Sequence, residues 1–216
     1  MKYLVISDIH GSAEAANIAI EAYKLHHCDY ILCLGDILYH GPRNDLPSSY
    51  APKQVISLLN PLKDKIIAVR GNCDAEVDQM VLDFSITSDY NILFINDHKF
   101  FLSHGHIYGP NNLPKLNKED YFLSGHTHIP TIENHLLNPG SIALAKNDHP
   151  NTYAIIDEEN FTVDTTKHEI YMQTKIDYQI LRGISHAIFI KHQINTHYFL
   201  QQRHHIFHYN PQKHYD

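Results

Sequence analysis

Short apolar runs alternate with polar, glycine-containing clusters along the first 130 residues. The runs at 2–7, 30–36 and 65–72 are almost continuously apolar, which is typical of strands buried on both faces. After Ser12, a residue suited to cap a helix, apolar positions recur with the helical period, and a second helix is predicted over about 53–62. This β-α-β-α-β order predicts an α/β arrangement with its ligand site at the carboxyl ends of the strands.

The second half of the chain is richer in strands. We expect a hairpin through an Asn-Asp turn, a further strand, a segment ending in a turn, a second hairpin and a last strand. These elements are predicted at 90–106, 120–128, 131–141, 151–163 and 169–173. Together they predict one domain over residues 1–176. Residues 177–216 have no clean period, hold seven of the 19 histidines, and are predicted to be a C-terminal extension of unknown role.

The composition restricts which binding partners and which cellular compartment we expect for this protein. The net charge of −7 argues against long nucleic acid as a ligand, because such proteins neutralise phosphates with a basic surface. No apolar run reaches the roughly 18 residues of a membrane span, and the N-terminus is predicted to be a buried strand and not a signal peptide. Three cysteines without a framework spacing favour a reducing compartment, so we expect a cytoplasmic protein.

Five of the apolar runs end in Asp, Asn or His beside a glycine. Because strand ends of one sheet lie side by side, we expect their loops to point into one crevice. Two carboxylates, an amide oxygen and four imidazoles in one crevice would need cations to be satisfied, and two divalent ions would form two sites. The five clusters are SDIHG (7–11), LGD (34–36), RGNCD (70–74), LSHGH (102–106) and SGHTH (124–128).

In this order the clusters resemble the calcineurin-like metallophosphoesterase superfamily, whose pattern is D-x-H, G-D, G-N-H-[DE], a later His and G-H-x-H. Longer stretches such as "GDILYHGPRNDLP" and "VRGNCDAEVDQM" resemble the YfcE-type bacterial phosphodiesterases of that superfamily. The resemblance covers roughly residues 1–175. It implies a four-layer αββα sandwich, in which helices flank two mixed β-sheets.

The resemblance also implies the roles of seven metal ligands. Asp8, His10 and His128 would hold the first metal, and Asp36 would bridge both. Asn72, His104 and His126 would hold the second, whereas His106 matches a position beside the ligands. The resemblance favours Mn²⁺, and the oxygen and imidazole donors also suit Zn²⁺, Fe or Ni²⁺. A metal-bridging hydroxide would attack the phosphorus, and the residues expected to be catalytic are Asp8, His10, Asp36, Asn72 and His104.

Position 73 departs from the superfamily pattern. Cys73 stands where the superfamily usually has a His that acts as general acid or phosphate contact, and Tyr39 and His40 replace the Asp and Arg that accompany it.

Other residues near these clusters have supporting or substrate-binding roles in our prediction. Asp74 is expected to brace the loop, and Pro139-Gly140 to form a turn that supports the metal loops. Arg43 either reaches the substrate or pins the proline-rich loop to an acidic neighbour. The candidate substrate contacts are Asn72, Arg43, His40 and Cys73.

These features predict a dinuclear phosphodiesterase that cleaves activated aryl diesters, because an aryl leaving group departs without a general acid. Two alternatives stay open. One is a binding module on the same fold, as in a subunit of the retromer sorting complex, although the chain keeps all seven ligands. The other is a phosphomonoesterase. The expected partners are a small phosphodiester and further copies of the chain in a homo-oligomer, either a dimer or a tetramer.

Overall fold

The structure of the protein is a computed structural model, and it describes residues 1–176. The first half alternates strands and helices, as expected. Strands β1 (Tyr3–Ile6), β2 (Tyr30–Cys33) and β3 (Ile66–Ala68) are parallel and adjacent. The predicted extension at 177–216 lies outside the described residues, so the domain boundary stays a prediction.

The helices of this half begin where the sequence places their caps. Helix α1 (Ala13–Leu25) follows Ser12, whose side chain accepts a hydrogen bond from the backbone N–H of Ala15. Helix α2 (Pro52–Leu59) begins with a proline and continues as the 3₁₀ helix η1 (Asn60–Lys65). A short helix, α3 (Glu76–Gln79), follows β3.

A second sheet is built from the middle of the chain. Its strands are β4 (Tyr90–Ile95), β5 (His98–Ser103), β6 (Tyr121–Ser124), β7 (Pro130–Glu133) and β8 (Leu136–Pro139), in the spatial order β4-β5-β6-β8-β7. The predicted hairpin turn is confirmed, since Asn96 and Asp97 both have positive φ. The segment expected only to end in a turn forms the β7–β8 hairpin through Asn134, which also has positive φ.

The last three strands return to the first sheet. Strands β9 (Thr152–Ile156), β10 (Asn160–Thr165) and β11 (Ile170–Lys175) extend it to the order β11-β10-β9-β1-β2-β3, and β9 pairs antiparallel with β1. Strand β1 is therefore central, although it is the first strand of the chain.

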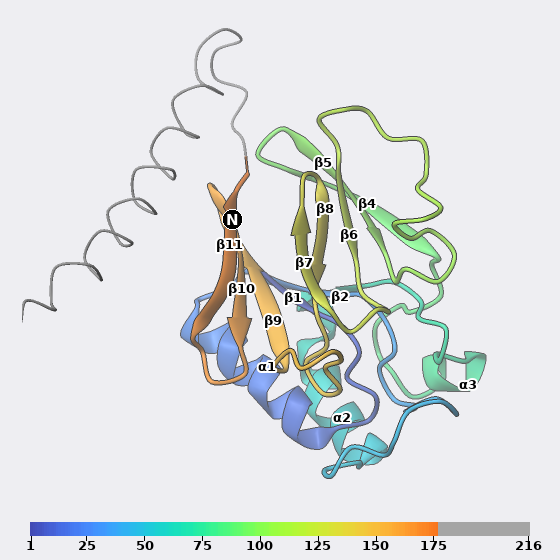
Figure 1. Cartoon of the computed structure of the whole chain (residues 1–216). Coiled ribbons are helices and arrows are strands. Elements are labelled where there is room, and N and C mark those ends of the chain that lie inside the picture. Colours follow the sequence, from blue (N-terminus) through green and yellow to red (C-terminus); the bar gives the residue numbers. More distant parts are fainter. Residues whose placement is uncertain (177–216) are drawn as a thin grey trace, which may run out of the picture. The chain divides into compact units, whose positions relative to one another are not determined.

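Two apolar cores separate the layers. One lies between α1, α2 and the six-stranded sheet, where Ala15, Ala16, Ala19 and Ala22 of α1 are buried. The other lies between the two sheets and includes Phe100, Leu123 and Phe161. Figure 1 shows α1 and α2 along the six-stranded sheet.

The expected pair of mixed sheets with few helices is confirmed. Between β5 and β6 the chain forms an irregular segment without a helix. Tyr108 of this segment packs edge-on against Phe101, with ring centroids 5.4 Å apart. The segment contains the run GPNNLP (109–114), whose glycine, prolines and asparagines disfavour a helix.

The part of the chain that the structure describes contains no helix long and apolar enough to cross a membrane.

Candidate metal centre

The polar strand ends meet between the two sheets. Sharp backbone turns bring them together: five of the seven expected metal ligands have positive φ, a conformation uncommon for residues with a side chain. Such conformations concentrate at functional sites, where the surrounding structure holds them in place. The five residues are Asp8 (58°), His10 (50°), Asp36 (56°), His126 (67°) and His128 (62°).

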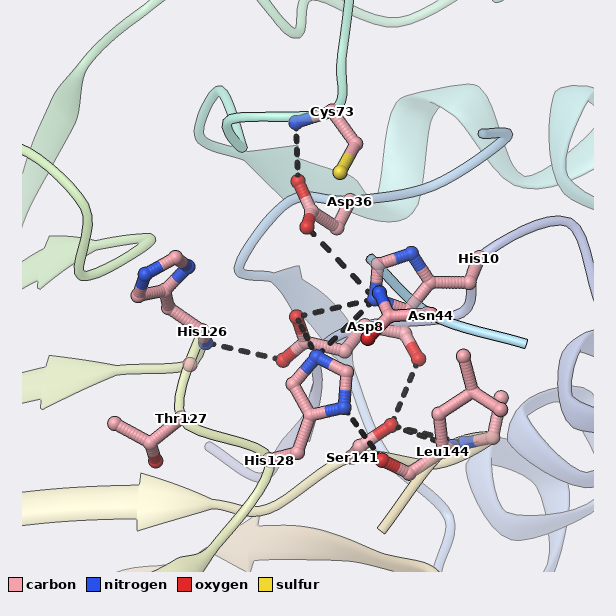
Figure 2. A network of polar contacts seen from close by, with 12 residues as sticks. Asp8, His10, Asp36, Asn44, Cys73, His126, Thr127, His128, Ser141 and Leu144 are labelled. Atoms are coloured by element: carbon pink, nitrogen blue, oxygen red, sulfur yellow. Dashed lines mark hydrogen bonds and ion pairs between the residues drawn. The ribbon is translucent and has the colours of Figure 1, made fainter. Parts of the chain in front are cut away.

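A first cluster consists of Asp8, His10 and His128. The Nε2 atoms of the two histidines lie 3.2 Å apart. Oδ1 of Asp8 lies 3.6 Å from Nε2 of His10 and 3.3 Å from Nε2 of His128. All three side chains are buried and point toward one another (Figure 2). The structure thus brings together the three residues expected to hold the first metal.

A second cluster surrounds Nε2 of His104. This atom lies 3.4 Å from Oδ2 of Asp36, 3.1 Å from Oδ1 of Asn72 and 3.2 Å from Nδ1 of His126. Oδ2 of Asp36 also lies 3.8 Å from Nε2 of His10, which belongs to the first cluster. Asp36 therefore stands between the clusters, as a bridging ligand would.

The donor atoms of the first cluster fit a cation. His10 donates its Nδ1–H to the carbonyl of Tyr39, and His128 donates its Nδ1–H to the carbonyl of Leu144. In the neutral rings, Nε2 therefore carries a lone pair. Oδ1 of Asp8 is buried and has no hydrogen-bond partner among the described residues. Three acceptors face one another without a donor, which is the arrangement of metal ligands oriented by backbone carbonyls.

The second cluster repeats this arrangement. His104 donates its Nδ1–H to the carbonyl of Leu34, at 2.7 Å. Its Nε2 then faces the carboxylate of Asp36 and the amide oxygen of Asn72 as another acceptor. Oxygen and imidazole donors of this kind suit divalent transition metals. Both clusters therefore fit divalent ions.

Charge in the site is balanced by these contacts. Burial disfavours the carboxylate of Asp8, but where His10 and His128 carry a second proton, their imidazolium groups beside it hold the pKa of Asp8 well below its usual value. Burial also disfavours a charged His104, yet Asp36 and Asp8 raise the pKa of His104 to about 9. The buried carboxylates thus attract positive charge, which protons or divalent cations can supply.

Asp74 joins the two loops that carry Asp36 and Asn72. Its carboxylate accepts hydrogen bonds from the backbone N–H groups of Asp36, Ile37 and Gly71, at 2.9, 2.8 and 2.7 Å. The expected brace is therefore confirmed, and it reaches beyond its own loop to the end of β2.

Cys73 lies beside the metal-binding clusters. Its backbone N–H donates to Oδ1 of Asp36 at 2.8 Å, and the amide of Asn72 donates to its sulfur at 3.2 Å. Sγ lies within 4.8 Å of ligand atoms of both His10 and Asp36. Burial, followed by the nearby charge of Asp36, raises the pKa of the Cys73 thiol to about 12. The protonated thiol is a weak acid at this place.

A cavity of about 370 Å³ opens over the clusters. Its lining includes Asn72, Cys73 and His126 together with the loop segment 41–44, which carries Arg43. Arg43 makes no ion pair with a carboxylate within residues 1–176, so the alternative in which it pins the loop finds no acidic partner there. Asn44 braces the loop by donating to the carbonyl of His40 at 2.8 Å.

Two other candidates take different positions. His40 is absent from the cavity lining, and its ring packs edge-on against Tyr39 and Tyr50, with centroids 4.7 and 5.4 Å away. The ring of His106 lies tilted beside that of His104, at 5.4 Å between ring centroids and 60° between ring planes. This matches the expectation that His106 lies beside the ligands.

Sequence reasoning missed several residues that hold or line the site. Ser141 donates to the carbonyl of Asp8 at 2.9 Å, and Asn138 donates to the carbonyl of Gly125 at 2.9 Å. The stretch NPGS (138–141) therefore supports the metal loops through its polar side chains, flanking the expected turn. Thr127 and Lys146 line the cavity. Thr127 sits inside the GHTH motif, whereas no local pattern marks Lys146.

Comparison with known proteins agrees with this geometry. Residues 1–160 match the calcineurin-like phosphoesterase superfamily domain. The chain is 44% identical over 167 residues to phosphodiesterase YfcE of Escherichia coli strain K12, covering 76% of this chain and 91% of that protein. The solved structure of the E. coli phosphoesterase Yfce superposes with a TM-score of 0.79 and 41% identity, covering 82% of this chain and 100% of that chain.

A more distant relative is the probable metallophosphoesterase YsnB of Bacillus subtilis strain 168. It is 27% identical over 171 residues, covering 74% of this chain and 86% of that protein. The resemblance inferred from the five polar clusters is thus confirmed over the part of the chain that carries them. This chain belongs to the calcineurin-like phosphoesterase superfamily.

Proposed function

We propose that the protein is a phosphodiesterase that works with two divalent metal ions. The observation that carries this proposal is the pair of acceptor clusters. His10, His104 and His128 each donate Nδ1–H to a backbone carbonyl, so that the Nε2 lone pair of each ring faces a carboxylate or amide oxygen. Membership of the superfamily and the likeness to a phosphodiesterase support the same reaction class, the hydrolysis of phosphoester bonds.

The proposed ligands divide between two ions. Asp8, His10 and His128 would hold the first ion, and Asp36 would contribute to both sites. Asn72, His104 and His126 would complete the second site. When bound, two divalent ions polarise the phosphate and lower the pKa of a coordinated water. The backbone carbonyls of Tyr39, Leu34 and Leu144 fix the tautomers of three ligand rings, which keeps Nε2 free for the metal.

The preference for diesters with good leaving groups follows from Cys73. A thiol whose pKa is raised to about 12 donates a proton poorly to a departing alkoxide near neutral pH. A nitrophenolate needs no such help. Cys73, Asn72 and Arg43 all line the cavity and would contact the phosphate there. His40 would influence the substrate only indirectly, because its ring packs against Tyr39 and Tyr50 and so helps to position the loop that carries Arg43.

A hydrolysis panel tests this function. Metal-free protein is supplemented with Mn²⁺, Zn²⁺, Fe²⁺ or Ni²⁺ and assayed on an aryl diester, an aryl monoester and an alkyl diester. We expect turnover of the aryl diester, highest with Mn²⁺, and its loss in Asp36→Asn. Lys167→Met, on the turn after β10 and outside the cavity lining, should retain the turnover. Activity on monoesters alone would support the phosphomonoesterase, and inactivity with every metal the binding module.

We also propose that the protein acts in the cytoplasm as a homo-oligomer. Light scattering of the purified full chain at several concentrations measures the oligomeric state, and a monomer at all of them would contradict this part of the proposal.

A further inference from the structure

Two cations face the cavity without a partner. Arg43 and Lys146 both line it, and neither makes an ion pair with a carboxylate among residues 1–176. Among the Lys and Arg side chains of residues 1–176, only Lys99 and Arg70 form ion pairs, with Asp120 at 2.6 Å and with Glu76 at 3.6 Å. What distinguishes Arg43 and Lys146 is that both line the same cavity. In a chain with 24 acidic and 17 basic residues, two unpaired cations in one cavity are available to a ligand.

The lining of the cavity holds little negative charge to oppose them. Asp36 is its one acidic residue, and Asp36 belongs to the second metal-binding cluster. The remaining polar side chains are neutral amides, a hydroxyl, a thiol and imidazoles. When Asp36 binds the metals, its negative charge is compensated there. The remaining lining of the cavity then carries a net positive charge from Arg43 and Lys146.

Both cations are carried by segments that are tied to the first metal-binding cluster. Lys146 donates its backbone N–H to the carbonyl of His128 at 3.4 Å, and Leu144, two residues earlier, accepts from Nδ1 of His128 (Figure 2). The loop of Arg43 is tied in the same way, because the carbonyl of Tyr39 accepts from Nδ1 of His10. The two cations therefore stand on segments anchored at His10 and His128.

The cavity holds no further cation. No Lys or Arg besides Arg43 and Lys146 is among its lining residues, and Asn72 and Cys73, which also line it, are neutral. A phosphodiester bound at the clusters therefore shares the cavity with two cations that can contact one of its ester groups.

We infer that Lys146 and Arg43 form an anion subsite, and that the substrates of this protein are phosphodiesters whose ester group carries a second phosphate. An arginine fork and a lysine point charge are suited to such a group. The inference rests on the proposed function, since it names the substrate class of the same site. It assigns Lys146 a role in specificity.

Two nucleotide esters test the inference. One is the p-nitrophenyl ester of thymidine 5′-phosphate, and the other carries an additional 3′-phosphate. Both release nitrophenolate from the same bond, so the ratio of their kcat/KM values isolates the second phosphate. We expect the Mn²⁺-loaded full chain to prefer the phosphorylated ester by about tenfold, which corresponds to about 1.4 kcal/mol. In Lys146→Met the ratio should fall toward one, and Lys146→Arg should restore most of it.

Calorimetry supplies a readout that does not depend on turnover. Thymidine 3′,5′-bisphosphate should bind more tightly than thymidine 5′-phosphate, and Lys146→Met should remove most of the difference, while the matched control Lys167→Met retains it. Turnover of both esters at equal kcat/KM, with equal binding of the two nucleotides, overturns the anion subsite and leaves the phosphodiesterase standing. Loss of turnover with a retained, Lys146-dependent binding difference instead overturns the proposed reaction and keeps the subsite.

Discussion

The Nε2 atoms of His10 and His128 lie 3.2 Å apart, although both rings direct their Nδ1–H to backbone carbonyls. Two lone pairs at this separation repel each other unless a proton or a cation lies between them. Oδ1 of Asp8 adds a third acceptor to the same point. Three acceptors that converge in this way are an arrangement that a divalent ion would satisfy.

Metal binding should raise thermal stability as a consequence. At one hundred times its Kd, Mn²⁺ should add about 2.7 kcal/mol to the free energy of unfolding, or roughly 5–10 °C in Tm for a chain of this size. Differential scanning calorimetry with EDTA and with Mn²⁺ measures the shift. His128→Ala should lose most of it, whereas His149→Ala, outside both clusters, should retain it. An equal shift in the two variants would contradict the assignment of His128.

Removal of the Asp74 carboxylate should destabilise the protein and impair activity together. In Asp74→Asn an NH₂ group faces backbone N–H groups that now donate to a carboxylate oxygen. We expect a loss of about 2–4 kcal/mol in denaturant unfolding, with reduced kcat because Asp36 moves. Asp78→Asn is the control, since its carboxylate caps the exposed helix α3 through the N–H of Ala75. Its cost should stay near 1 kcal/mol, and equal costs would disprove a special role for Asp74.

A histidine at position 73 should extend the range of leaving groups. We predict that Cys73→His increases kcat on an alkyl or nucleotide diester by about tenfold, below the 10²–10⁴-fold of a fully positioned acid, because Tyr39 cannot orient the new ring as a carboxylate would. The gain on an aryl diester should be smaller.

Room for the ring limits this variant. A Cβ on Gly41 would lie only 2.8 Å from the sulfur of Cys73, so the loop packs closely on the small thiol. The imidazole must therefore turn toward the cavity or displace the loop. Cys73→Ser has a side chain of similar size but no imidazole, so its kcat on the alkyl diester should not increase. If serine and histidine perform alike on alkyl diesters, a missing general acid is not the reason for the substrate preference.

Lowering the pH should reduce the free energy of unfolding, in part because of His26, which lies at the end of α1. Burial, only partly offset by Asp164, lowers the pKa of His26 in the folded protein. The folded state therefore favours the neutral ring, and the unfolded chain takes up the proton more readily as the pH falls through about 6.5. The contribution of His26 to stability is present above that pH and is lost below it.

Thermal unfolding in EDTA at pH 7.5 and 5.5 checks this sign. The drop in Tm between the two pH values should be smaller in His26→Gln than in the unmodified protein. The exposed neighbour His27 supplies the control as His27→Gln. A drop that is unchanged in His26→Gln would show that His26 does not titrate differently in the folded and unfolded states.

Much of the site was predictable because its ligands follow strand ends. A polar cluster such as SDIHG directly after a buried run is a local pattern, and parallel strands bring their carboxyl ends to one edge. The same local logic predicted β1, β2 and the hairpin at Asn96-Asp97. Residues whose role depends on partners far away in the sequence cannot be recognised from a local pattern. Ser141 supports Asp8 across 133 positions, and Lys146 reaches the cavity from a loop without a motif.

Local patterns in the sequence predicted most of the elements and the chemistry of the site: buried strands, capped helices and seven candidate ligands of oxygen and imidazole type, since period, caps and strand ends are properties of neighbouring residues. Contacts within the folded chain decide that β9–β11 return beside β1 and which tautomer His10, His104 and His128 adopt. They also bring Arg43 and Lys146, which make no ion pair within residues 1–176, into one cavity. These features depend on contacts between residues far apart in the chain, which no local pattern encodes.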